Sequence, residues 1–197
     1  MNKEITRQNL LSAAKSLFIK NGYEETTMSD IAQEANLCRR TVYAYYDSKA
    51  EIYKAVVDIE VKIVLDDLTS IATRNIPPQQ KIIEFIYGHF RILKEMVDRN
   101  GTLRSTFFRN IWGLEHFRKG FDQKEMQMLQ RIITEGKAEG VFNVINVKRT
   151  TEIILNCMRG FEVPYIRGQI WKGNSIEEMR LETKKLIYGA LGYNINK

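Results

Sequence analysis

Five side chains within seven residues carry the groups with which proteins contact nucleic acids. They are Arg39, Arg40, Thr41, Tyr43 and Tyr45. Guanidinium, hydroxyl and phenol groups reach both base edges and phosphate oxygens, and the small Ala44 among them allows close approach to a groove. Two plainer interpretations exist: solvated charges for the arginines, and packing against a neighbouring helix for the tyrosines. The choice depends on the elements that hold this segment.

The apolar pattern predicts a helix at about 39–45 and another directly before it, at about 27–35. Thr27 can cap the earlier helix, with Asp30 placed to return the contact. Val42 and Tyr46 lie one turn apart, and packing them against the earlier helix turns the five polar residues outward. Two short helices joined by a tight turn form a helix-turn-helix.

Apolar residues with helical spacing recur along the whole chain, while no strand pattern is present. We therefore expect an all-α fold of about nine helices, with a helix-turn-helix domain at 1–48 and an antiparallel helical bundle at 49–197. The later helices are expected at about 49–76, with apolar positions Ile52, Val56, Ile59 and Ile63, and at 78–100, 102–111, 114–139, 147–167 and from 176 onward.

The N-terminal segment resembles the TetR/AcrR family of bacterial transcriptional regulators. The resemblance covers residues 13–53, AAKSLFIKNGYEETTMSDIAQEANLCRRTVYAYYDSKAEIY. A second motif, Glu139-Gly140-Val141-Phe142, is similar to the glycine, valine and phenylalanine that follow the seventh helix of the family. The resemblance implies DNA binding through the helix-turn-helix, a homodimer, and a ligand cavity in the bundle.

The resemblance also implies individual roles. Thr27 and Lys49 would hold phosphates, Tyr43 and Tyr45 would contact the backbone or bases, and Arg40 and Thr41 would help to read sequence, with Arg39 on the same surface. A helix N-terminus such as that at Thr27 favours an anion, because its free N–H groups point outward. A lysine in the first turn of a helix is unfavourable for the helix itself, so an external anion would explain Lys49.

Three residues depart from the family pattern. Asn36 stands where the turn glycine is usual, Cys38 where a serine commonly caps the recognition helix, and Tyr46 where phenylalanine is common. Asparagine tolerates the left-handed conformation, whereas cysteine is a poor cap. Cys38 is interpreted as a structural substitute for serine rather than as a redox sensor. The motif is expected to survive all three changes.

The bundle carries dense aromatic content that suits an effector cavity for a flat or apolar molecule. An ordinary core would have the same composition. An arginine turned inward would add affinity for a carboxylate or acyl phosphate. The two histidines lack metal-ligand spacing, and no metal or cofactor is expected. The candidate effector-binding residues are Phe85, His89, Phe107, Arg109, Trp112, His116 and Phe161.

The last two expected helices carry more apolar residues than one small bundle needs to bury, which predicts a dimer interface. Gly160 lies in the middle of a helix, where glycine costs about 1 kcal/mol relative to alanine, and a close helix approach would explain it. The expected interface residues are Ile153, Gly160, Leu186 and Ile187, supported by Leu155, Phe161 and Leu191.

Charge and composition narrow the function classes. The net charge of +6 suits a polyanion, but residues 1–49 carry seven Lys/Arg against six Asp/Glu, so the local placement of charge must carry the argument. Cys38 and Cys157 match no disulfide or zinc spacing. Neither a signal peptide nor a membrane-spanning run is present, so we expect a cytoplasmic protein without a membrane partner.

We therefore predict a transcriptional regulator, expected to be a repressor, that binds a palindromic operator in double-stranded DNA as a homodimer and is released by a small-molecule effector. The alternative is a DNA-binding protein of the same fold that is controlled by a protein partner, with an aliphatic interior and an exposed apolar patch. An enzyme is the weakest of the three classes, because no GxSxG, HExxH, Walker or Rossmann motif occurs.

Overall fold

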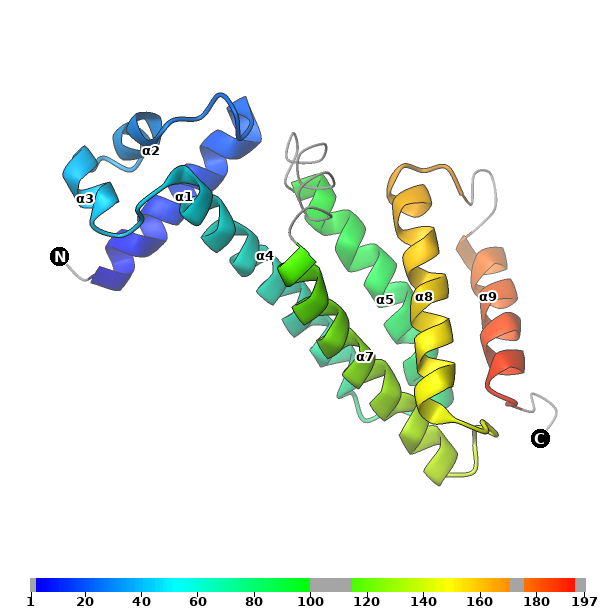
Figure 1. The fold of residues 1–197 in the computed structure, drawn as a ribbon. Helices are drawn as coiled ribbons and strands as arrows, with labels where there is room; N and C mark the ends of the chain where they lie inside the picture. Colours follow the sequence, from blue (N-terminus) through cyan, green and yellow to red (C-terminus); the bar gives the residue numbers. More distant parts are fainter. Residues whose placement is uncertain (1–2, 100–114, 171–175, 194–197) are drawn as a thin grey trace. The chain divides into compact units, whose positions relative to one another are not determined.

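The computed structural model describes residues 3–99, 115–170 and 176–193, and these ranges form eight helices and no strand (Figure 1). This confirms the all-α prediction. The further helix expected at 102–111 lies outside the described residues. The helices are α1 (Lys3–Asn21), α2 (Met28–Glu34), α3 (Arg39–Tyr43), α4 (Lys49–Ala72), α5 (Pro78–Arg99), α7 (Glu115–Ala138), α8 (Val147–Ile166) and α9 (Ile176–Ala190).

The chain divides into two compact units. The first comprises residues 1–63 and 96–119, and the second comprises residues 64–95 and 120–197. Helices α4, α5 and α7 therefore each contribute residues to both units. These units describe which residues pack together, whereas the boundary expected after residue 48 separates two folding domains. That boundary stays a prediction.

Local capping explains where most helices begin and end. Thr27 and Asp30 form a reciprocal capping box at α2, and the Asn146 side chain accepts a 2.9 Å hydrogen bond from the Arg149 N–H at the start of α8. At α4, Ser48 Oγ accepts from the Glu51 N–H, but the Glu51 carboxylate accepts from the Asp47 N–H at 2.8 Å. The start of α4 is thus held by two side-chain contacts, one to the Glu51 N–H and one to the Asp47 N–H.

The first unit is built around apolar faces of α1, α2, α3 and the first half of α4. Phe18, Tyr23 and Tyr53 form an aromatic cluster with ring centroids 4.8–5.7 Å apart. Fully buried apolar side chains of this unit are Leu10, Ala14, Phe18, Ile31, Val42 and Ile52.

The expected apolar stripe of α4 is only half correct. Ile52 and Val56 are buried, but Ile59 and Ile63 are 43% and 40% exposed. Glu60 is buried instead, because its carboxylate pairs with Lys15 of α1 and lies 4.0 Å from the Arg99 guanidinium. A buried carboxylate requires such partners.

Helices α5, α7, α8 and α9 lie side by side in the second unit (Figure 1). Their fully buried apolar side chains include Ile82, Phe85, Leu129, Ile132, Ile133 and Leu155. Gly140 ends the turn after α7 with a φ of +70°, and Phe142 then returns to pack its ring on Gly136, where a Cβ atom would overlap it. The glycine, valine and phenylalanine motif is thus a helix stop followed by a packing contact.

Among the residues described, no helix combines the length and apolar character that a membrane span requires.

Candidate DNA interface and effector site

The turn between α2 and α3 has the geometry of a helix-turn-helix. Asn36 adopts a φ of 53°, the left-handed conformation that the turn requires and that asparagine tolerates. Ala35 and Val42, on the facing sides of the two helices, are 2% and 0% exposed. Burial of Val42 orients α3, so the opposite face of this helix points to solvent.

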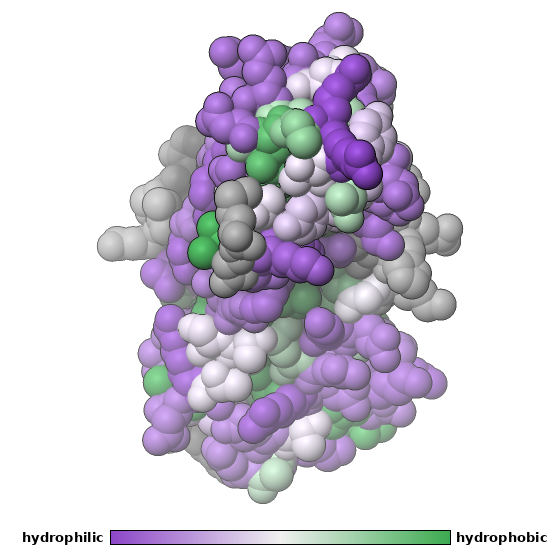
Figure 2. Space-filling model, turned by 90° about the vertical axis from the view of Figure 1, so that its left-hand side faces the viewer, coloured by the Kyte–Doolittle hydropathy of each residue, from purple (hydrophilic) through white to green (hydrophobic). Residues whose placement is uncertain are grey.

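That outer face carries the predicted DNA-binding residues. Arg39 and Arg40 are exposed, and Tyr43 is 49% exposed. Tyr45 is half-buried, and its hydroxyl donates a hydrogen bond to the Lys3 carbonyl at 3.3 Å, which ties the end of the motif to α1. On the side seen in Figure 2, the surface is mainly hydrophilic and apolar side chains form only small separate patches.

Cys38 begins the recognition helix as a weak cap. It occupies the N-cap position with extended backbone, but its side chain makes no capping hydrogen bond. Its Sγ lies 3.1 Å from Thr41 Oγ1, and hydrogen bonding by Thr41 lowers the pKa of the thiol. The side chain of Thr41 is therefore partly engaged within the chain.

Thr27 directs its hydroxyl into its own helix. Thr27 Oγ1 accepts from the Asp30 N–H at 3.2 Å and donates to Asp30 Oδ2 at 2.7 Å, and the Thr27 N–H donates to the same oxygen at 2.8 Å. These hydrogen bonds lower the pKa of Asp30. A DNA phosphate at this helix start would therefore lie close to a carboxylate, and the phosphate contact of Thr27 stays a prediction.

Lys49 has partners inside the chain that the sequence did not indicate. Its Nζ donates to the carbonyls of Tyr23 and Glu24 at 2.7 and 3.1 Å, and it lies 4.4 Å from the centroid of the Tyr23 ring. These contacts account for a lysine in the first turn of α4 without an external anion. An ammonium has three protons, so a phosphate contact with the third stays a prediction.

The predicted effector-binding residues occupy different environments. Phe85 and His89 are fully buried, whereas Phe161 is 49% exposed. Phe161 lines an apolar groove of about 390 Å³ between α5, α8 and α9, together with Phe90 and Met158. Phe107, Arg109 and Trp112 lie outside the described residues, and His116 belongs to α7 but its side chain is not among those described.

Two glutamates that the sequence analysis missed surround His89. Glu125 of α7 forms an ion pair with His89 Nδ1, and Glu162 Oε1 of α8 lies 3.3 Å from His89 Nε2. Burial alone would lower the pKa of His89, but the charges and hydrogen bonds of the two carboxylates raise it to about 9. The signal in the sequence was a glutamate, Glu125, within the apolar stripe that continues to Leu129 and Ile132.

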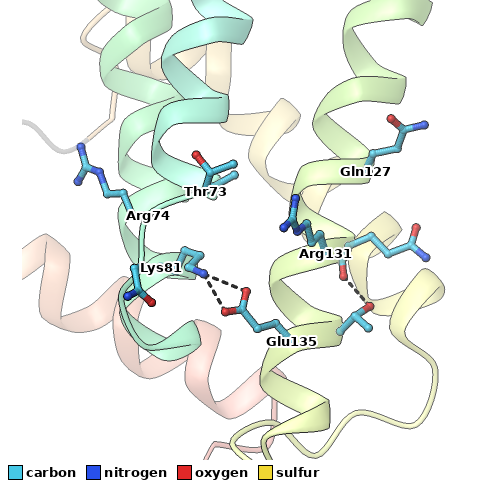
Figure 3. Close-up of a pocket in the computed structure, with 10 residues that line it drawn as sticks. Thr73, Arg74, Lys81, Gln127, Arg131 and Glu135 are labelled. Atoms are coloured by element: carbon cyan, nitrogen blue, oxygen red, sulfur yellow. Dashed lines mark hydrogen bonds and ion pairs between the residues drawn. The ribbon is translucent and has the colours of Figure 1, made fainter.

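A second concave region, of about 730 Å³, lies where the end of α4, the start of α5 and α7 meet. Lys81 and Glu135 point toward each other there and form two 2.9 Å hydrogen bonds (Figure 3). All of its lining residues except Ala72 carry polar or charged side chains, whereas small-molecule cavities are typically lined by apolar residues. This cleft is a weaker candidate for an effector site than the interior around His89.

The face formed by α8 and α9 leaves large apolar side chains in solvent. Ile153, Leu181 and Leu186 are 58%, 54% and 73% exposed, and Ile187 is half-buried. A Cβ atom added at Gly160 would have no atom of the described residues within 4 Å, so no close helix approach among these residues explains this glycine. Leu155 and Leu191 are fully buried, so their expected contribution to an interface was wrong: they complete the core of the chain.

Comparisons with known proteins agree with this geometry. The family model for bacterial regulatory proteins of the tetR family matches residues 10–56, which span the helix-turn-helix and the start of α4. Along 97% of its length the chain is 25% identical to the IcaR negative transcriptional regulator of the biofilm operon icaADBC from Staphylococcus aureus, all of which is covered. Residues 10–56 therefore carry the DNA-binding segment of bacterial regulatory proteins of the tetR family.

Solved structures share the same fold. A TetR/AcrR regulator from Thermobifida fusca matches with a TM-score of 0.69 at 24% identity, with 95% of this chain and 98% of that chain covered. The fatty acid degradation regulator FadR from Bacillus halodurans also has a TM-score of 0.69, at 16% identity, with 98% and 100% covered. These structures show the fold, while the family-model match and the likeness to IcaR identify the chain as a DNA-binding transcriptional regulator.

Proposed function

We propose that this regulator is a repressor that binds a palindromic DNA operator as a homodimer and leaves it when a small-molecule effector binds in the second unit. The observation that carries the DNA-binding part is the outer face of α3, where Arg39, Arg40 and Tyr43 are exposed on a helix held by the buried Val42. Repression is supported by the likeness to IcaR, whose name describes a negative regulator.

Dimerisation is supported by the apolar face of α8 and α9. Four large apolar side chains on these two helices are at least 49% exposed: Ile153, Phe161, Leu181 and Leu186. An apolar face of this kind is typical of a protein interface. A second copy of the chain would cover it symmetrically, and a palindromic operator matches the twofold symmetry of such a dimer.

Control by an effector is supported by the buried ionisable group at His89. Ionisable residues with perturbed pKa values cluster at functional sites, and an interior that needed only packing would be aliphatic. The alternative, control by a protein partner, would use the apolar face of α8 and α9 for that partner. The oligomeric state of the free protein separates the two proposals, because only a homodimer covers this face without a partner.

The proposal is tested by selecting binding sites from random duplex DNA with the purified protein. We expect enrichment of inverted repeats whose half-sites lie about one helical turn apart, or a multiple of it. Light scattering at micromolar concentration should give the mass of a dimer. Direct repeats, or a monodisperse monomer, would contradict the proposal.

A further inference from the structure

The interior of the second unit holds a carboxylate, that of Glu125, with one oxygen that has no hydrogen-bond partner among the described residues. Glu125 is 0% exposed, and its Oε1 is paired with His89. Its other oxygen, Oε2, is buried and has no hydrogen-bond partner within the part of the chain that the structure describes. A buried carboxylate oxygen without a partner is strongly destabilising, so a chain that keeps it has a reason other than stability.

The single positive charge of His89 is divided between two carboxylates. Glu162 lies 3.3 Å from His89 Nε2, on the opposite side of the imidazole from Glu125. On α8, Arg159 directs its guanidinium to Asp122 of α7, at 3.0 Å. The place beside Glu125 Oε2 therefore favours a positively charged hydrogen-bond donor.

Apolar side chains adjoin this group along every helix that forms it. Phe85, Leu129 and Met158 lie one turn from His89, Glu125 and Glu162 respectively, and all three are buried. A ligand in this interior would meet a carboxylate at one end and apolar side chains over the rest of its surface. Glu162 is 13% exposed, so the group is reached from solvent on its side.

We propose that Glu125 receives the cationic end of the effector, which makes the effector an organic cation with an ammonium or amidinium group on an apolar body. This inference rests on the proposed function, since it names the chemical class of the molecule that releases the operator. It differs from the expectation of an anionic group at Arg109, which lies outside the described residues, because it is argued from the buried Glu125 oxygen that lacks a hydrogen-bond partner among the described residues.

The inference is tested with three probes that share one apolar chain: hexylammonium, hexanol and hexanoate. Calorimetry on the full chain without DNA should show hexylammonium binding about tenfold or more tightly than hexanol, and hexanoate most weakly, because only the cation forms a charge-assisted hydrogen bond with Glu125. Equal binding of the cation and the alcohol, or no binding of hexylammonium at millimolar concentration, would overturn the inference.

A matched pair of variants locates the cation. Glu125→Gln keeps the shape of the side chain and should reduce hexylammonium affinity to that of hexanol, whereas Glu95→Gln removes an exposed carboxylate of α5 and should leave it unchanged. Undiminished cation binding by folded Glu125→Gln overturns the inference. If that variant fails to fold, the imidazole NMR signals of His89 decide in the unmutated protein, because a cation at Glu125 must shift them and an absence of shift overturns the site.

Operator binding separates this inference from the proposed function. If hexylammonium binds through Glu125 and leaves operator affinity unchanged, the cation site stands and effector control through it fails. If hexanoate weakens operator binding while hexylammonium does not bind, effector control stands and the cation site fails.

Discussion

At the scale of single residues, Arg40 and Lys49 are two cations near the candidate DNA interface that have different surroundings and different expected roles. Arg40 is exposed, whereas Lys49 is held by two carbonyls of the loop before α2. A long side chain in solvent is available to read bases. One that is fixed within the chain maintains the shape of the motif and offers DNA only its remaining proton.

We therefore predict that Arg40→Ala weakens binding to the preferred operator by about 1–3 kcal/mol and relaxes its sequence preference. Lys49→Ala should weaken binding to all sequences alike and reduce the salt dependence by about one unit of slope. Fluorescence anisotropy on specific and random duplexes at several salt concentrations measures both effects. Arg131→Ala, which removes an exposed arginine from α7, is the control. Equal losses on specific and random DNA for Arg40→Ala would show that it reads no sequence.

The raised pKa of His89 predicts that the free energy of unfolding depends on pH. Its pKa is raised to about 9 in the folded chain from about 6.5 in an unfolded one, so its contribution is complete below pH 6.5 and is lost as the pH rises toward 9. Urea unfolding should show a fall in the free energy of unfolding across this range. His89→Gln should remove most of that fall, since Glu125 and Glu162 then face a neutral group at every pH. An unchanged slope in the variant would contradict the assignment.

At the scale of helices, the sequence predicted what depends on neighbouring residues. Thr27 caps α2 with Asp30 as expected, and Asn146 with Arg149 and Gly140 after α7 likewise act within a few positions of the chain. The buried charges escaped prediction for the opposite reason. Glu60 meets Lys15, and Glu125 meets His89, across long stretches of chain, so their burial depends on tertiary packing that periodicity does not encode.

The close contact between Gly136 and the Phe142 ring predicts that only glycine fits at this position near the end of α7. The Phe142 ring lies where a Cβ atom would stand, so Gly136→Ala should displace this ring despite the better helix propensity of alanine. We expect a loss of about 1–3 kcal/mol in the free energy of unfolding, measured by urea denaturation. Gly120→Ala, at an open position of the same helix, is the control and should be neutral or stabilising. A stabilised Gly136→Ala would mean that Phe142 does not pack there in solution.

The open surroundings of Gly160 make it a direct probe of the dimer. Because nothing lies within 4 Å of its Cβ position, Gly160→Leu fits within one chain and should keep or raise its helical content. At a close crossing of two α8 helices the same leucine would separate the protomers and abolish operator binding. Gly120→Leu provides the matched control on α7. A Gly160→Leu dimer of unchanged stability, seen by light scattering and dilution, would place the interface elsewhere.

At the scale of the whole molecule, α4, α5 and α7 are helices that run from the first unit into the second. Each contributes residues to both units, and in the first unit Glu60 of α4 is paired with Lys15 of α1. We therefore expect a change in the packing of α4 in the second unit to reach, along this continuous helix, the ion pair between Glu60 and Lys15 of α1. Half-sites on DNA fix the distance between two recognition helices at about 34–36 Å, so a small displacement is enough to prevent both from docking.

This connection predicts reciprocal coupling between effector and operator. Any compound that weakens operator binding by a given factor must itself bind more weakly to the operator complex by the same factor, typically about 5- to 150-fold, because both paths lead to the same ternary state. Calorimetric titration of that compound into free and operator-bound protein measures the second factor, and anisotropy with and without the compound measures the first. Glu60→Gln should reduce both factors together if the Lys15 pair transmits the change, while leaving effector affinity for the free protein unaltered. Unequal factors would show that the compound acts through another equilibrium, by binding the DNA itself or by unfolding the protein. Equal factors that survive Glu60→Gln would move the coupling to α5 or α7.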